Sequence, residues 1–319
     1  MAHHRRFRFG VQIRGAADAP AWIAKARAIE SRGYASLLLP DHFHEQLGPI
    51  SALTAAASAT RALELGVLVM SNDYRHPVVL AKELATLDMM SGGRACVGLG
   101  AGWARSDYDP AGMPFDAAGT RIDRLGESLA VLKGLFADGP LTFHGRHYRI
   151  TNLDGRPKPV RRPHPPFLIG GGGRRLLSLA AREADIVGIN TAIPGGAAPP
   201  GWVPDRTAAA TDQKIAWVRE AAGSRFDDLE LSLMCQIVSV TGDRSRVAAE
   251  AAADLGVDAD VLLESPYVLI GTVDQIVDTL RRRRDRFAIS YVIHPPEAAR
   301  YPAASVEAFA PVVARLSGR

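Results

Sequence analysis

The chain alternates between short, nearly unbroken apolar runs and longer amphipathic segments. The first four runs begin at Phe7, Ser36, Leu65 and Ala95, so consecutive runs start about 30 residues apart. Apolar runs of this kind are typical of strands that are covered on both faces. A strand, a helix and a turn repeating at this spacing predict parallel strands joined by crossover helices.

Helical patterns separate these runs and continue after them. Each of the first three starts at or near a proline, which the first turn of a helix tolerates. The predicted helices are residues 20–32, 49–60, 77–90, 119–136, 174–183, 207–222, 244–255, 272–284 and 305–316. The further predicted strands are residues 167–169, 186–189, 230–240 and 288–293.

Eight strands that alternate with helices predict a (β/α)8 TIM-like barrel in a single domain of residues 1–319. Three loop insertions account for the length beyond the roughly 250 residues of such a barrel. They are residues 137–166, 190–206 and 256–271; the first holds a short hairpin at 141–150 and a proline-rich connector at 156–166.

A doubly wound sheet is the competing fold, and it would carry G-x-G-x-x-G after its first strand. The first strand here leads into residues 14–17, which read Arg-Gly-Ala-Ala. A Gly-Leu-Gly-Ala-Gly stretch instead follows the fourth strand, with Trp103 in place of the third glycine. The pattern therefore favours the barrel.

Composition narrows the class of protein. Hydrophobic residues make up 47% and charged residues 23%, which excludes a mainly disordered chain. The two cysteines form no CxxC pair, which excludes a disulfide framework and a cysteine-rich zinc site. With no apolar run near the ~18 residues of a membrane span and no signal-peptide pattern, we expect a cytoplasmic protein with no membrane partner.

The net charge of +4 comes mostly from arginine, since only five of the 38 basic residues are lysines. Arginine favours planar anions, so an anionic small molecule fits this chain at least as well as nucleic acid does. The Arg281–Arg284 run has no recognition module beside it, and we expect it to be a solvated helix face with no nucleic-acid partner.

In a barrel, catalytic groups lie at the carboxyl ends of the strands. The second strand ends in residues 40–45, which read Pro-Asp-His-Phe-His-Glu. His42 and His44 could begin a metal site, but the later strand ends offer glycines, Asn190 and His294 without an aspartate, so we expect no metal. A surface loop with incidental histidines is the plain alternative.

The third and fourth strands also end in candidate residues. Ser71 and Asn72 could bond a planar heterocycle, or form an ordinary turn. Trp103 could wall a pocket or simply pack. Asp107 could act as a general acid or base if buried, or be an exposed loop carboxylate.

The fifth strand ends in four glycines, residues 170–173, and Arg174 and Arg175 open the next helix. Glycines at a helix N-terminus expose main-chain N–H groups where the helix dipole favours an anion. The P-loop signature is absent. These residues therefore predict a phosphate-binding loop of another kind.

Together these positions resemble the luciferase-like monooxygenase family, in particular its branch that uses the deazaflavin coenzyme F420. The matching pieces are FGVQ at the first strand, Gly33-Tyr34, Pro40–Phe43, and Arg75–Pro77 with Ala81. They continue with residues 85–88, 91–94, 98–103, 170–173 and 271–273. They span nearly the whole chain in the family's order.

The resemblance implies a luciferase-like barrel, usually dimeric, with a flavin-type ring across its mouth. His42 would lie beside the ring, and Asp107 stands where F420 relatives carry a glutamate proton donor. A non-prolyl cis peptide is implied within residues 68–70. In the sugar-phosphate dehydrogenases of this branch, a tryptophan follows the Asp-His-Phe motif. Gln46 stands near that position here, which disfavours sugar-phosphate oxidation.

The resemblance and the strand ends together give the expected site. His42 and Asp107 are the candidate catalytic residues, and His44, Trp103 and Asn190 line the substrate pocket. The expected cofactor-binding residues are Asp41, His42, Val69, Met70, Ser71, Asn72, Gly100, Gly102, Gly171, Gly172, Gly173 and Arg174.

Three functional hypotheses follow. The first is an F420-dependent oxidoreductase that moves hydride between the deazaflavin and an unidentified small organic substrate, working as a homodimer with a reductase that supplies reduced cofactor. The second is an FMN-dependent two-component monooxygenase of the same superfamily. The third is a flavin- or F420-binding protein without turnover. A metal-dependent hydrolase ranks behind them.

Overall fold

Eight parallel strands close into a barrel in the computed structural model, which describes residues 5–197, 201, 203–295 and 305–318. Each strand pairs with the next, and the last pairs with the first. In this order they are β1 (Arg8–Gln12), β2 (Ser36–Leu39), β3 (Glu64–Val67), β5 (Ala95–Gly100), β8 (Phe167–Gly171), β9 (Ile186–Ile189), β10 (Glu230–Met234) and β13 (Ile289–His294). The predicted (β/α)8 architecture is confirmed.

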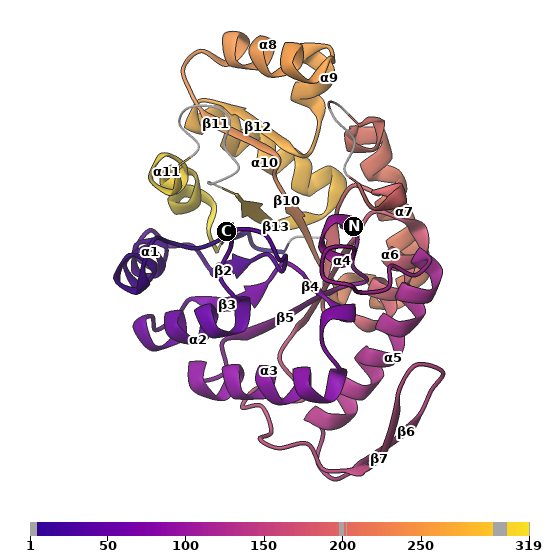
Figure 1. Ribbon diagram of the computed structural model, residues 1–319. Coiled ribbons are helices and arrows are strands. Elements are labelled where there is room, and N and C mark those ends of the chain that lie inside the picture. The colour runs from indigo at the N-terminus through magenta and orange to yellow at the C-terminus, as the bar shows by residue number, and fades with distance from the viewer. Residues whose placement is uncertain (1–4, 198–200, 202, 296–304, 319) are drawn as a thin grey trace.

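Helices surround the barrel (Figure 1). They are α1 (Ala19–Ser31), α2 (Pro49–Ala59), α3 (Pro77–Ser91), α5 (Ala118–Phe136), α6 (Arg174–Glu183), α7 (Ala208–Ala222), α10 (Val273–Phe287) and α11 (Val306–Leu316). Prolines open α2 and α3, as the pattern predicted. None of the helices in the described part of the chain is long and apolar enough to cross a membrane.

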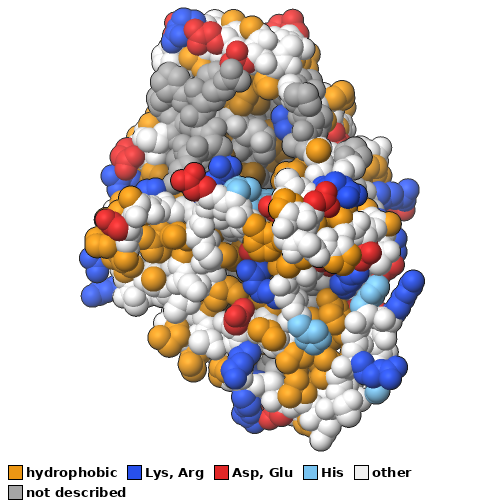
Figure 2. All heavy atoms as spheres, viewed as in Figure 1, with side chains coloured by type: hydrophobic (Ala, Val, Ile, Leu, Met, Phe, Trp, Pro, Cys, Tyr) orange, Lys and Arg blue, Asp and Glu red, His pale blue; other side chains and the backbone are white. Residues whose placement is uncertain are grey.

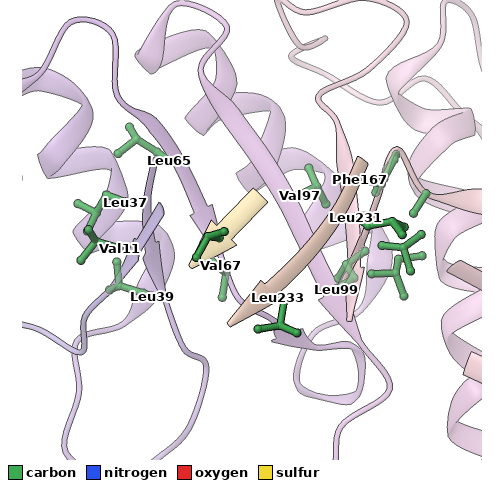
Figure 3. Packing of buried hydrophobic residues seen from close by; sticks show 14 of the residues in the cluster. Val11, Leu37, Leu39, Leu65, Val67, Val97, Leu99, Phe167, Leu231 and Leu233 are labelled. Atoms are coloured by element: carbon green, nitrogen blue, oxygen red, sulfur yellow. The ribbon is translucent and has the colours of Figure 1, made fainter. Parts of the chain in front are cut away.

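Alternate residues of the strands belong to two different hydrophobic clusters. Leu37 and Leu39 of β2 join the large cluster between strands and helices, whereas Leu38 joins a small cluster inside the barrel. Figure 3 shows members of the large cluster on the barrel strands, among them Val11 on β1, Leu37 on β2 and Leu231 on β10. Because a strand places successive side chains on opposite faces, an unbroken apolar run fills both layers.

The third strand is interrupted near its carboxyl end. It resumes as β4 (Met70–Ser71), which pairs with β5. The peptide between Leu68 and Val69 is cis, as the resemblance implied. Gln12 on β1 donates a hydrogen bond of 2.7 Å from Nε2 to the carbonyl of Leu68, which fixes this segment to β1, on the far side of β2.

The predicted single strand at residues 230–240 is wrong. β10 ends at Met234, and β11 (Ile237–Val240) pairs with β12 (Val268–Gly271) in a separate parallel sheet. The predicted loop at 256–271 holds α9 (Ala259–Glu264) and β12. Together with α8 (Arg244–Leu255), these elements enclose a hydrophobic cluster of their own. We call residues 237–271 the satellite unit; it forms the upper part of Figure 1.

The other two insertions contain local structure. β6 (Leu141–His144) and β7 (Arg149–Leu153) form the predicted hairpin. In 190–206, two 3-10 turns are described, η2 (Pro194–Gly196) and η3 (Pro204–Arg206). Residues 198–200 and 202 of this predicted pocket loop lie outside the described residues.

The arginine run on α10 is only partly a solvated face, which corrects that expectation. Arg281 and Arg282 are exposed, but Arg283 donates to the carbonyls of four residues. Arg284 lies over the Phe7 ring. On the face drawn in Figure 2, basic and acidic side chains are interspersed.

Candidate functional site

The loops after β2 and β5 bring His42 and Asp107 into contact at the barrel mouth. His42 lies three residues beyond β2, and Asp107 lies in α4 (Arg105–Tyr108), a short helix that the sequence analysis missed. Nδ1 of His42 lies 2.6 Å from Oδ2 of Asp107. The side chain of Asp107 is only 3% exposed, so it is not the exposed loop carboxylate of the plain alternative.

Asp107 is held as a carboxylate. Burial opposes its ionisation, but hydrogen bonds from His42, the main-chain N–H of Phe43 and the Tyr74 hydroxyl outweigh burial and keep the pKa of Asp107 below its ordinary value. The Tyr74 hydroxyl lies 3.1 Å from Oδ2, the same oxygen that His42 contacts. An ionised carboxylate only accepts hydrogen bonds, so Nδ1 of His42 carries the proton between them.

Two of the three predicted pocket residues join this pair. The His44 ring stacks on the His42 ring, with centroids 4.9 Å apart and planes 15° apart. Trp103 packs edge-on against His42 with a centroid separation of 5.7 Å, and it is 39% exposed. His42, His44 and Trp103 therefore form one cluster at the mouth.

Asp41, predicted to bind cofactor, is the centre of a buried clamp. Its two carboxylate oxygens accept hydrogen bonds of 2.6 and 3.0 Å from Arg75, which precedes α3. Burial would lower the pKa of Arg75, but its pairing with Asp41 outweighs this and raises the pKa. Asp41 also accepts a hydrogen bond from the main-chain N–H of Ser71 at 3.2 Å, so the clamp fixes Ser71 within the predicted cofactor-binding segment 69–72.

The side chain of Asn72 is 1% exposed and only half satisfied. Its Nδ2 donates to the hydroxyl of Tyr148, on the β6–β7 hairpin, at 3.2 Å. Among the described residues, its Oδ1 has no hydrogen-bond partner. A buried acceptor without a partner is costly, so Asn72 fits a site that a ligand donor completes.

Glycines leave room beside this segment. A Cβ on Gly100 would lie 2.6 Å from Cγ2 of Val69, so the glycine lets Val69 fit at the top of the barrel. Gly102 has φ of 75°, and a Cβ there would overlap the hydroxyl of Tyr108. Tyr108 in turn bonds the Ser71 hydroxyl at 3.0 Å.

The predicted phosphate loop lies across the mouth, at the end of β8. A Cβ on Gly172 would overlap the main chain of Thr191 and Ala192. Gly173 is different, because no heavy atom lies within 4 Å of where its Cβ would be and no side chain caps α6 after it. The N–H groups of the first turn of α6 are therefore open to a ligand.

The remaining predicted residues on this side of the mouth already bond other residues of the protein. Arg174 makes two contacts of 3.0 Å with Glu220 on α7, and Arg175 pairs with Asp123 on α5. Asn190 donates its main-chain N–H to Gly171 and is grouped with the glycine loop, not with His42. Anion binding here would rest mainly on the main chain of the loop.

The sequence analysis missed the residues that support this site. Tyr74, Tyr108 and Tyr148 hold Asp107, Ser71 and Asn72, and no spacing marked them. Arg75 did carry a signal, because it belongs to a motif that matched the family, but its bond to Asp41 was not foreseen.

Residues 6–288 match the family described as luciferase-like monooxygenase. A curated relative, the FMNH2-dependent dimethylsulfone monooxygenase of Pseudomonas putida, is 33% identical over 145 residues, 46% of this chain and 39% of the relative. The F420-dependent glucose-6-phosphate dehydrogenase of Nakamurella multipartita is 30% identical over 288 residues, 84% of this chain and 79% of the relative.

A solved structure shares the fold. It is the coenzyme F420-dependent tetrahydromethanopterin reductase of Methanopyrus kandleri, with a TM-score of 0.79, 19% identity, and coverage of 98% of this chain and 100% of that chain. The sequence match to the first curated relatives covers only part of those proteins, between 39% and 54% of their length.

Proposed function

Since the chain belongs to the luciferase-like monooxygenase family, we propose that it is an F420-dependent oxidoreductase, which transfers hydride between the deazaflavin and a small organic substrate. The observation that carries the proposal is the His42–Asp107 pair, because hydride transfer to or from a carbon–oxygen or similar group needs a positioned proton donor or acceptor. The relative named as an F420-dependent glucose-6-phosphate dehydrogenase, which matches 84% of this chain, supports the choice of cofactor.

The residues present fit such a cofactor. The half-satisfied Asn72 is a buried acceptor for a ring N–H, and Asp41 and Ser71 hold that segment in place. A phosphate would be bound by the open first turn of α6 after Gly173. When bound, F420 supplies the carbon that donates or accepts the hydride.

His42 is the group that we assign to proton transfer. Asp107 accepts a hydrogen bond from the Nδ1–H of His42, so Nε2 of His42 is left to give or take a proton at the substrate. Asp107 is one methylene shorter than the family's glutamate, and with a lowered pKa it serves as the orienting carboxylate instead of the acid.

The experiment is calorimetry of the purified protein with F420 and, separately, with FMN. We expect saturable F420 binding and much weaker FMN binding. Tight FMN binding without F420 affinity would contradict the proposed cofactor. The absorbance of bound deazaflavin, followed during a substrate screen, then reports turnover.

A second candidate is an FMN-dependent two-component monooxygenase, favoured by the 33% identity to the dimethylsulfone enzyme. Such an enzyme would need reduced flavin from a partner reductase. Oxygen consumption with supplied FMNH2, absent in a no-protein control, would favour it. Failure of both assays in every substrate screen, with cofactor still bound, would leave the third hypothesis of a binding protein.

The substrate class is constrained at one position. Gln46, near the place of the tryptophan of sugar-phosphate dehydrogenases, donates from Nε2 to the carbonyl of Pro40 at 3.1 Å and offers no aromatic wall. We therefore propose a substrate other than a sugar phosphate. Glucose 6-phosphate should give no turnover when it is tested as the first member of the screen.

A further inference from the structure

We propose that His42, His44 and Asp107 form a binding site for a divalent transition-metal ion such as Zn²⁺, and that the bound ion blocks the proton-transfer pair. Binding itself stands on the geometry alone, whereas the block rests on the function proposed above. The later strand ends offer no third ligand, which is why no metal was expected; Asp107 in α4 completes the set instead.

The three side chains are close enough to share one ion. One ligand atom from each lies within 4.8 Å of the other two. Tetrahedral zinc bonds of about 2.0–2.1 Å place ligand atoms about 3.3 Å apart, so the cluster needs only local adjustment. His44 is exposed, so its ring can leave its stack on His42 and turn toward the ion, and the 2.6 Å contact between His42 and Asp107 opens to admit it.

The donor set has the chemistry that such an ion selects. Two imidazoles and one carboxylate are ligands for zinc and for divalent iron or cobalt, and they leave further positions open to water. Coordination through Nδ1 of His42 requires the ring proton, which the pairing with Asp107 places on Nδ1, to move to Nε2, so a neutral ring changes tautomer without losing a proton.

The surroundings supply the support that a ligating carboxylate needs. Tyr74 donates to Oδ2 of Asp107 at 3.1 Å and the N–H of Phe43 to Oδ1 at 3.4 Å, which orient the group from outside. The nearby guanidinium of Arg75 pairs with both carboxylate oxygens of Asp41, so its positive charge is balanced and does not oppose a bound cation.

The consequence follows from the shared atoms. An ion on Nδ1 of His42 replaces the hydrogen bond to Asp107 that orients the ring, and it places a double positive charge where a proton must be gained or lost. The ion would therefore inhibit turnover, and a chelator would restore it.

The test starts from metal-free protein without cofactor or substrate. Calorimetry with ZnCl2 should give one saturable site, and Co²⁺ should give visible absorbance bands of a low-coordinate histidine site. His44→Ala should weaken binding by more than about 10-fold with an unchanged melting temperature, since it removes one ligand from an exposed side chain. His144→Ala, an exposed histidine on the β6–β7 hairpin, is the matched control and should bind as the wild type does.

The outcomes separate the two proposals. No saturable site, or wild-type affinity in His44→Ala, overturns the metal site whatever the protein catalyses. Metal binding without any F420 binding leaves the site standing and removes the proposed function. In active protein, turnover that one equivalent of Zn²⁺ fails to reduce would overturn the inhibitory role.

Discussion

The two sides of the barrel mouth are built in opposite ways. On the side of β2, β4 and β5, polar side chains bond one another: His42 with Asp107, Asp41 with Arg75, and Ser71 with Tyr108. On the side of β8 and β9, glycines present bare main chain, and the nearby arginines are paired with acids on neighbouring helices.

The difference matches the two functions proposed for this mouth, proton transfer and phosphate binding. A group that moves a proton must be held in one geometry with its charge set by its neighbours, which a dense side-chain network provides. A group that binds a phosphate needs N–H donors and space, which glycines at a helix start provide. Substitutions of His42, Asp107 and Tyr74 on the first side should therefore affect mainly turnover, and those in the glycine loop on the second should affect cofactor affinity.

The largest effect is expected from His42→Ala. Loss of the proposed proton-transfer group should lower kcat by about 10²–10⁴-fold, the usual contribution of general acid–base catalysis. Cofactor affinity by calorimetry should change far less. An equal loss in both quantities would show that His42 binds cofactor and does not act on a proton.

On the other side, Gly172→Ala should weaken cofactor binding and destabilise the protein. Its Cβ would overlap the main chain of Thr191 and Ala192, and overpacking of this kind costs about 1–3 kcal/mol. Gly173→Ala is the matched control, since its Cβ meets open space, and its melting temperature should equal that of the wild type. Equal melting temperatures for the two variants would contradict the close approach at Gly172.

Tyr74→Phe removes one hydrogen bond from Asp107 and leaves the ring in place. The pKa of Asp107 should rise, and kcat should fall by about 3–10-fold, in line with a net hydrogen-bond energy near 1 kcal/mol. NMR titration of the carboxyl carbon measures the pKa. Cofactor affinity should be unaffected, and a main effect on affinity would place Tyr74 on the binding side.

The smallest effect is a pH dependence of stability. Because the folded-state pKa of Asp107 lies below the unfolded value, its contribution is complete above the unfolded pKa and is lost as pH falls through the folded one. The difference in unfolding free energy between wild type and Asp107→Asn should therefore be constant near neutrality and shrink in acid. Urea titrations at several pH values below 6 measure it; a difference that grows in acid would reverse the assigned sign.

The barrel was predictable because its strands fill two layers and are therefore mostly apolar along their length, and because prolines and glycines mark helix ends. The error at 230–240 has the same origin. β10 and β11 are both apolar and only Cys235 and Gln236 separate them, so the pattern could not show that the chain leaves the barrel there.

Individual residues of the candidate site could be picked out from the sequence, but the contacts between their side chains could not. His42, His44, Asp107 and Trp103 each stood out at a strand end. Their contacts depend on how the loop through α4 folds back over β2, which no local spacing encodes. The same holds for Arg75, whose partner Asp41 is 34 positions away.

Arg283 has a consequence for how this barrel can be remodelled. Its guanidinium holds the carbonyls of Leu263, Ser265, Pro266 and Val268, at the return end of the satellite unit, against α10. The packing of α8 against the rest of that unit is separate from the barrel's own cluster. A module that replaces α8 must therefore cover Leu262, Val268 and Ile270 with apolar side chains of its own, and it must leave residues 263–268 and this one arginine in place.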